Sequence, residues 1–161
     1  MQTFLVSPNF DTCAKILDSK RLNKQITECF QILQANLSSL YRWHNHPACR
    51  MWKPYHLYLY GYIDSMQYEW NKRYKKVHKS YRMFLELISA IYKYNYSQLQ
   101  EWHLSEKPCW FYDERIYVSH RSNLLRKKPE YYSQFKWKEP DNLPYFWPTK
   151  CGDYAKIYDN V

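Results

Sequence analysis

The chain has 161 residues and carries 24 Lys and Arg against 15 Asp and Glu, which gives a formal net charge of +9 at pH 7. This length fits one domain with a buried core, and the positive charge favours polyanionic partners. Only two glycines occur, which argues against barrels and sandwiches because those folds need many tight turns. No apolar run is long enough to span a membrane, and the N-terminus MQTFLVSPNF lacks the pattern of a signal peptide.

The cysteines are five in number, widely spaced, and form no C-x-x-C pair. This pattern argues against a disulfide framework and against a zinc finger, so we expect a reducing intracellular setting. The high content of Tyr, Lys and Asn is typical of AT-rich genomes, and a virus-encoded protein fits that composition.

Apolar residues recur at helical spacing from the start of the chain. Residues 9–18 and 20–37 each carry one apolar stripe, which predicts two helices. The phase slips between these stripes, so we expect a bend or a short break near the sequence DSKR. The stretch 38–46 is expected to be a connection, and Pro47 is well suited to the first position of a short helix.

Further helices are predicted in the rest of the chain. Pro54 starts or kinks a helix that runs to about Val77, and others cover 80–93 and about 97–104. The sequence DERIYVSHRSNLLRK has helical spacing again, and Pro129 ends that helix and opens a short one.

The chain turns irregular after Trp137, with prolines and aromatic residues close together. We therefore expect an all-α fold, a compact single-domain helical bundle with an irregular proline- and aromatic-rich C-terminal tail. The domain is predicted over residues 1–148 and the tail over 149–161.

Basic charge is concentrated in two stretches. Residues 71–82 hold six Lys or Arg and no acid, and residues 119–138 hold six with one acid and several interleaved aromatic rings. Lys and Arg neutralise phosphates, and flat rings accept unstacked bases. Residues 71–82 favour a solvated helix face, whereas residues 119–138 favour a nucleic-acid surface.

The run WHNHPACRMWKP, residues 43–54, has three competing interpretations: a metal site, a nucleic-acid surface, or a buried corner. A zinc site would need ligands besides His44 and His46, and no zinc spacing is present. Each of these histidines could instead serve an active site or donate to a backbone carbonyl. Trp43 and Trp52 are expected in the core, because a small helical domain needs bulky apolar anchors.

Three ordered stretches, LDSKRLNKQ (17–25), WHNHPACRMW (43–52) and SHRSNLLRKKPEYY (119–132), resemble the pyrimidine-dimer DNA glycosylases of the phage endonuclease V group. The resemblance covers about residues 1–148 and implies a compact all-helical domain. It also implies an enzyme that flips a nucleotide out of damaged, bent double-stranded DNA, without a metal or an organic cofactor. We expect a monomer.

In that family the N-terminal amine attacks C1′ of the damaged nucleotide, an imine forms, the base is lost, and β-elimination nicks the strand. α-Amino groups suit this role because their ordinary pKa of about 7.7–8 leaves a neutral fraction at pH 7. Gln2 is too large for the usual removal of the initiator methionine, so the amine would be that of Met1. A carboxylate on the first long helix assists in the family, but here Arg21 occupies that position.

Two acids on the same helix face are candidates for the missing carboxylate, Asp18 and Glu28. Asp18 is also suited to capping the second helix, and Glu28 to a salt bridge. Gln25 is expected to contact DNA or the reacting sugar, or to form a structural hydrogen bond. A histidine of the 44–46 pair would shuttle a proton.

The resemblance also predicts residues that contact DNA backbone or stack on bases. They are Lys20, Arg21, Lys24, Arg50, His120, Arg121, Arg126, Lys127, Lys128, Tyr131, Tyr132 and Trp137.

The alternative function is a non-catalytic DNA-binding protein that keeps the basic aromatic surface, and the missing glutamate favours it. RNA is a second possible partner, because stacking and phosphate contacts serve both nucleic acids.

Overall fold

The computed structural model describes residues 1–53, 55–94 and 107–148, and throughout these ranges it contains helices and no strands. The helices are α1 (Phe10–Ile16), α2 (Ser19–Leu37), α3 (Pro47–Trp52), α4 (His56–Tyr74), α5 (Lys79–Tyr94), α7 (Glu114–Lys127) and α8 (Pro129–Tyr132), followed by a 3₁₀ turn η1 (Ser133–Phe135). The predicted all-α class is confirmed. The expected helix at about 97–104 and the tail 149–161 lie outside the described residues.

Local caps explain where several of these helices begin. Asn9 accepts a hydrogen bond from the Thr12 backbone amide at the start of α1, and Asp18 accepts one from the Arg21 amide at the start of α2. Asp18 therefore occupies the break that the phase slip near DSKR predicted. At the other end of α4, Lys75 adopts the left-handed conformation and terminates the helix.

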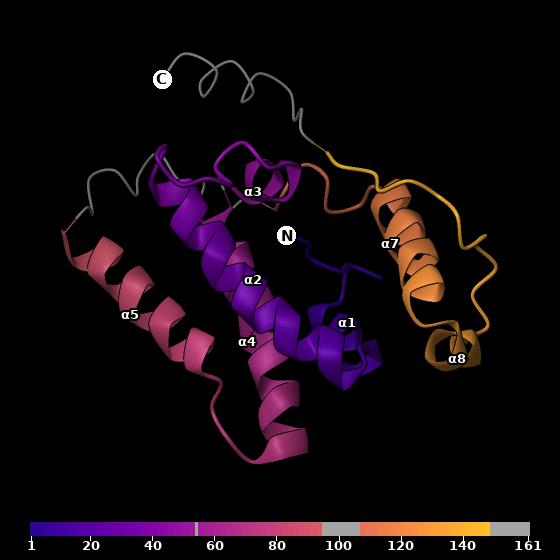
Figure 1. Ribbon diagram of the computed structural model, residues 1–161. Helices are drawn as coiled ribbons and strands as arrows, with labels where there is room; N and C mark the ends of the chain where they lie inside the picture. Colours follow the sequence, from indigo (N-terminus) through magenta and orange to yellow (C-terminus); the bar gives the residue numbers. More distant parts are fainter. Residues whose placement is uncertain (54, 95–106, 149–161) are drawn as a thin grey trace.

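Helices α2 and α4 cross at the centre of the molecule, with α5 and α3 packed against α2 and α1 packed against α4 (Figure 1). Helix α7 stands apart from this group, and the N-terminal segment runs between the two parts (Figure 1). Residues 2–6 are buried, so the start of the chain serves as core. The two parts of the bundle are thus joined through the N-terminal segment.

Large side chains fill the core around this segment. Trp52 and Tyr62 are fully buried and lie against each other with ring centroids 5.7 Å apart. The expectation that Trp52 is an anchor is confirmed, whereas the prediction that Trp43 lies in the core is wrong, since it is 41 % exposed. Trp43 sits in the turn before α3, where Arg42 lies 5.2 Å from its ring centroid.

The irregular segment after η1 is held against α7 by buried polar side chains. The Asn123 amide donates to the carbonyl of Leu143 at 3.0 Å, and Ser119 Oγ accepts from the Phe146 amide at 3.1 Å. Ser122 pairs with both the carbonyl of Pro140 and the amide of Leu143. These bonds satisfy backbone groups that no helix pairs, which explains how an irregular segment stays packed.

Within the described residues, the longest helices are too polar or too short for a bilayer, and none is a candidate membrane span.

Candidate active site at the N-terminus

The amine of Met1 meets a carboxylate of α2. Its nitrogen lies 3.8 Å from Oε1 of Glu28, and the Nζ of Lys24 lies 3.8 Å from the same oxygen. Gln25 is within hydrogen-bonding reach of the other carboxylate oxygen, at 3.4 Å. Met1, Lys24, Gln25 and Glu28 are called the amine site below.

The Met1 side chain is 2 % exposed, although the residue as a whole is partly exposed. The exposed part of Met1 therefore lies on its main chain. The thioether sulfur contacts Cys49 Sγ at 3.2 Å, and burial raises the pKa of that thiol to about 12. Cys49 is thus an uncharged packing partner for Met1, and its thiolate does not compete with the amine as a nucleophile.

Burial raises the pKa of Glu28, while the nearby amine, Lys24 and a hydrogen bond from the Gln2 backbone act in the opposite direction. The protonated acid is therefore favoured relative to an exposed glutamate. A carboxyl group in this position can stabilise a positive charge on the amine nitrogen and can also exchange a proton beside it.

Gln25 holds the N-terminal segment in place. Its Oε1 accepts from the backbone amide of Phe4 and from the hydroxyl of Tyr62, both at 2.7 Å, and its Nε2 donates to the carbonyl of Gln2 at 3.0 Å. Because Gln25 is fully buried, these bonds fix the path of the chain that ends at the amine. The structural hydrogen-bond interpretation of Gln25 is confirmed. Tyr62 was not predicted, since an isolated tyrosine in a helix carries no sequence signal for this contact.

The two histidines of the 44–46 pair behave differently. His44 Nδ1 lies 2.8 Å from the carbonyl of Ala35, a contact in which the ring donates to the end of α2. His46 caps α3 by accepting from the Ala48 amide at Nδ1, so in its neutral form Nε2 carries the proton. Burial, followed by the positive charge of the N-terminal amine, lowers the pKa of His46. His46 therefore lies within the electrostatic reach of the amine, and His44 is bonded to the backbone of α2.

Asp18 is engaged away from the amine. Its carboxylate caps α2, accepts from Arg21 Nη1 at 2.9 Å, and lies 3.3 Å from the hydroxyl of Tyr132. Arg21 also donates to the carbonyl of Lys127 at 2.9 Å, which ties α2 to the end of α7. The capping interpretation of Asp18 is thus confirmed, and Glu28 is the acid that reaches the amine.

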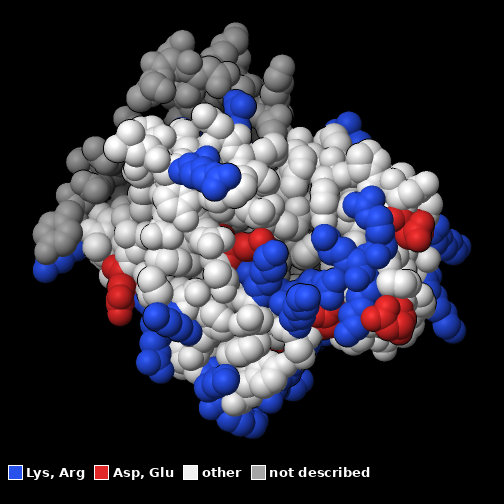
Figure 2. All heavy atoms as spheres, in the orientation of Figure 1, with Lys and Arg blue, Asp and Glu red and all other residues white. Residues whose placement is uncertain are grey.

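Positive charge surrounds the amine site. Burial is the main cause that lowers the pKa of Lys127. The charges of Arg21, Arg126 and Lys24 lower it further and Glu28 raises it, so these groups lie close together. Figure 2 shows Lys and Arg side chains gathered where α2 faces the α7–α8 corner, around acidic atoms. Two of the predicted DNA contacts on α2, Lys20 and Lys24, are exposed. Arg50 is exposed as well, in the last turn of α3.

Other side chains that were predicted to contact DNA are buried or bonded to other residues of the chain. His120 and Tyr132 are fully buried, so neither ring faces solvent. Arg121 donates to Val6, Glu114 and Glu139, which holds it against the N-terminal segment.

The rings of the α8 region stack mainly on one another. Trp137 lies over Phe135 with centroids 5.2 Å apart, and Lys128 lies 5.4 Å from the Tyr131 centroid. Tyr131 and Trp137 are half-buried in this cluster, so its composition reflects packing as well as surface chemistry.

Among the described residues, no three His, Cys, Asp or Glu side chains come together in a way that could hold a metal ion.

The comparisons with known proteins place this site in a family context. A family model described as pyrimidine dimer DNA glycosylase matches residues 1–83, the segment that contains the whole amine site and His46. Neither the curated proteins nor the solved structures gave a match to this chain.

Proposed function

The chain belongs to the pyrimidine dimer DNA glycosylase family, a family of DNA-repair enzymes, and we propose that it is a glycosylase with abasic-site lyase activity. The proposed substrate is double-stranded DNA that carries a pyrimidine dimer or another damaged pyrimidine. The observation that carries the proposal is the 3.8 Å contact between the Met1 amine and Glu28, within a cluster of Lys and Arg.

The proposed reaction uses Met1 as the nucleophile. Its neutral amine attacks C1′ of the damaged nucleotide, the bond from C1′ to the base breaks, and the base leaves with a proton. The sugar ring opens as the imine forms. Loss of a proton from C2′ then expels the 3′ phosphate, and water hydrolyses the imine to release the cleaved strand.

Glu28 has the role of the assisting carboxylate. The nitrogen of Met1 is positive both as an ammonium and as a protonated imine, so a carboxylate beside it stabilises the intermediate. Its raised pKa also suits it to donate a proton to the opening sugar. Arg21 occupies the position of the family glutamate. Glu28 lies two turns further along α2, so in this chain the acid beside the amine comes from a different position on the helix.

His46 is proposed as a hydrogen-bond donor to the substrate. Its Nδ1 is engaged by the Ala48 amide, so the neutral ring can donate from Nε2. Lys24 and Lys127 lie near Glu28 and are proposed to neutralise phosphates on either side of the extruded nucleotide.

A retained Met1 fits this proposal. Its buried thioether fills space beside Cys49, while Gln2 is held by Gln25 through its carbonyl and lies 3.2 Å from His120 through its amide. Removal of Met1 would leave a void and would place the new amine on a residue whose position is already set by these bonds.

Borohydride trapping tests the proposal. A duplex with one abasic site is incubated with the protein, and borohydride then reduces any imine to a stable covalent adduct. We expect an adduct with the unmodified chain and none with the chain acetylated at Met1. Peptide mapping should place the link at residue 1.

Clean absence of the adduct, with duplex binding intact at low salt, would contradict the lyase and support the DNA-binding alternative. An RNA duplex of the same sequence, used as competitor, reports whether the surface prefers DNA.

A further inference from the structure

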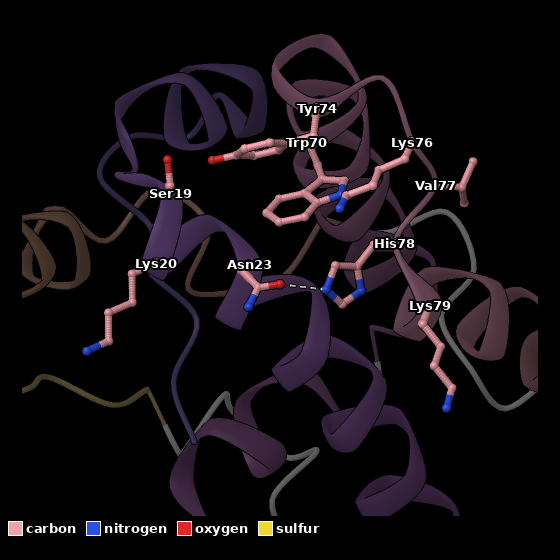
Figure 3. Close-up of a pocket in the computed structure, with 9 residues that line it drawn as sticks. All are labelled: Ser19, Lys20, Asn23, Trp70, Tyr74, Lys76, Val77, His78 and Lys79. Atoms are coloured by element: carbon pink, nitrogen blue, oxygen red, sulfur yellow. Dashed lines mark hydrogen bonds between the residues drawn. The ribbon is translucent and has the colours of Figure 1, made fainter.

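The basic stretch 71–82 takes no part in the amine site. In the structure it forms, together with the start of α2, an open pocket of about 630 Å³ (Figure 3). This volume is within the range of small-ligand sites, roughly 300–1,000 Å³. The pocket joins segments that are about fifty residues apart in the chain.

The floor of the pocket is aromatic. Trp70 lies 4.2 Å from Tyr74 between ring centroids, and His78 meets Trp70 edge-on at 5.3 Å. The Nε2 of His78 is 2.7 Å from Oδ1 of Asn23, so a hydrogen bond from α2 holds this wall in position (Figure 3). Tyr74 is 37 % exposed, which leaves ring surface open to a planar ligand.

The mouth of the pocket is cationic. Lys20, Lys76 and Lys79 are exposed and line it, and Lys76 Nζ lies 5.9 Å from the Trp70 ring centroid. Of the described residues that line the pocket, none is an Asp or Glu. The charge around the aromatic floor is therefore unbalanced and attracts anions.

One buried donor in this wall also lacks an acceptor. The indole Nε1 of Trp70 is buried and has no hydrogen-bond partner among the described residues. Figure 3 places Lys76, another donor, next to the same indole. A buried N–H without a partner is destabilising, so a ligand that brings an acceptor oxygen to this indole would gain a hydrogen bond.

We propose that this pocket binds a nucleotide of single-stranded DNA, with its base on the Trp70–Tyr74 floor and its phosphate among Lys20, Lys76 and Lys79. Stacking on an aromatic ring strengthens binding whatever the base, because every base has a flat face. The inference goes beyond the proposed function and does not depend on the chemistry of the amine.

We expect the bound nucleotide to be part of a DNA strand, because the pocket and the amine site are linked along one face of α2. Lys20 lies one helical turn before Lys24 on α2, so both side chains are on one face of the helix, about 5–6 Å apart along it. A strand that leaves the amine site along this face reaches Lys20 and then the pocket. A free mononucleotide would make only the contacts at its own base and phosphate.

Fluorescence anisotropy with a short labelled oligothymidylate tests the proposal at low salt. The variant Lys76→Gln/Lys79→Gln should bind about tenfold more weakly, whereas Lys15→Gln/Lys93→Gln should lose no more than about threefold through the general loss of charge. Both variants remove two exposed lysines, so they differ in position alone. Tyr74→Ser should weaken binding by a further factor of about five through lost stacking.

Equal weakening by the two lysine pairs would overturn the proposal, because binding would then follow net charge. Competition by thymidine monophosphate as strong as that by the oligomer would overturn the strand as the source. The pocket variants should keep the borohydride adduct, and the chain acetylated at Met1 should keep oligothymidylate binding. Failure of this proposal is therefore distinguishable from failure of the proposed function.

Discussion

Helices α2 and α7 both carry polar and basic side chains, but these side chains have different contacts. On α2, Lys24, Gln25 and Glu28 face the start of the chain and build a site around its amine. On α7, Ser119 and Asn123 form hydrogen bonds with the backbone of the irregular segment that follows η1. The difference arises because α2 lies beside the charged N-terminal amine, whereas α7 lies beside backbone amides and carbonyls that no helix pairs.

The largest effect is expected from a change at the acid of α2. Glu28→Gln keeps the shape and removes the negative charge beside the amine, so we expect strand cleavage at an abasic site to fall by about 10²–10³-fold. Single-turnover cleavage of a labelled duplex measures this. Glu130→Gln, an exposed acid on α8, serves as the control and should cleave normally. An unchanged rate for Glu28→Gln would remove the carboxylate from the mechanism.

A change on α7 should act on stability instead. Arg121→Met leaves Glu139 and the carbonyl of Val6 without their partner in a partly buried place. We expect a loss of about 3 kcal/mol in the free energy of unfolding, measured by urea denaturation. Cleavage by the folded fraction should stay near normal, and a selective loss of cleavage without a loss of stability would contradict the structural role.

The buried histidine of α7 predicts a dependence of stability on pH. Burial lowers the pKa of His120 to about 3, and its Nδ1 accepts from the Leu5 amide, so the folded protein holds it neutral. The unfolded chain takes up the proton near pH 6.5, so this contribution to stability is complete above that pH and is lost as the pH falls towards 3.

Substitution of His120 measures that contribution. His120→Asn keeps an acceptor for the Leu5 amide and removes the titration. Between pH 7 and pH 5 the original chain should lose about 2 kcal/mol more than the variant. Denaturation curves at the two pH values give the difference, and equal losses would show that His120 titrates normally.

The smallest effect concerns the charges around the amine. Lys24→Gln should lower duplex affinity a few-fold and reduce the slope of log affinity against log salt by about 0.9, the value for one phosphate contact. Lys15→Gln, in the last turn of α1, is the matched control with the same loss of charge. Identical slopes for the two variants would mean that Lys24 meets no phosphate.

Helical spacing and caps predicted most of the fold. The stripe in residues 20–37, Pro47 as a helix start and the break near Asp18 all follow from local rules, and the structure agrees with them. Trp43 was misplaced because a tryptophan in a turn can pack on a neighbouring ring and an arginine as easily as in a core.

The site was harder to predict than the fold. Sequence spacing puts Asp18 and Glu28 on one helix face, so spacing could not decide which of them meets the amine. The choice depends on where residues 2–6 run, and that path is set by contacts more than twenty residues away in the chain, from Gln25 and Tyr62. His120 shows the same limit, since a polar motif does not reveal that its ring is buried.

The buried thioether of Met1 has a practical consequence for anyone who handles this protein. Residues added ahead of Met1 would convert its amine into an amide and would have to leave through the crowded space beside Glu28 and Cys49. Affinity tags for purification therefore belong at the opposite terminus. A preparation with an N-terminal tag should regain cleavage only after a protease that leaves no scar restores Met1 as the first residue.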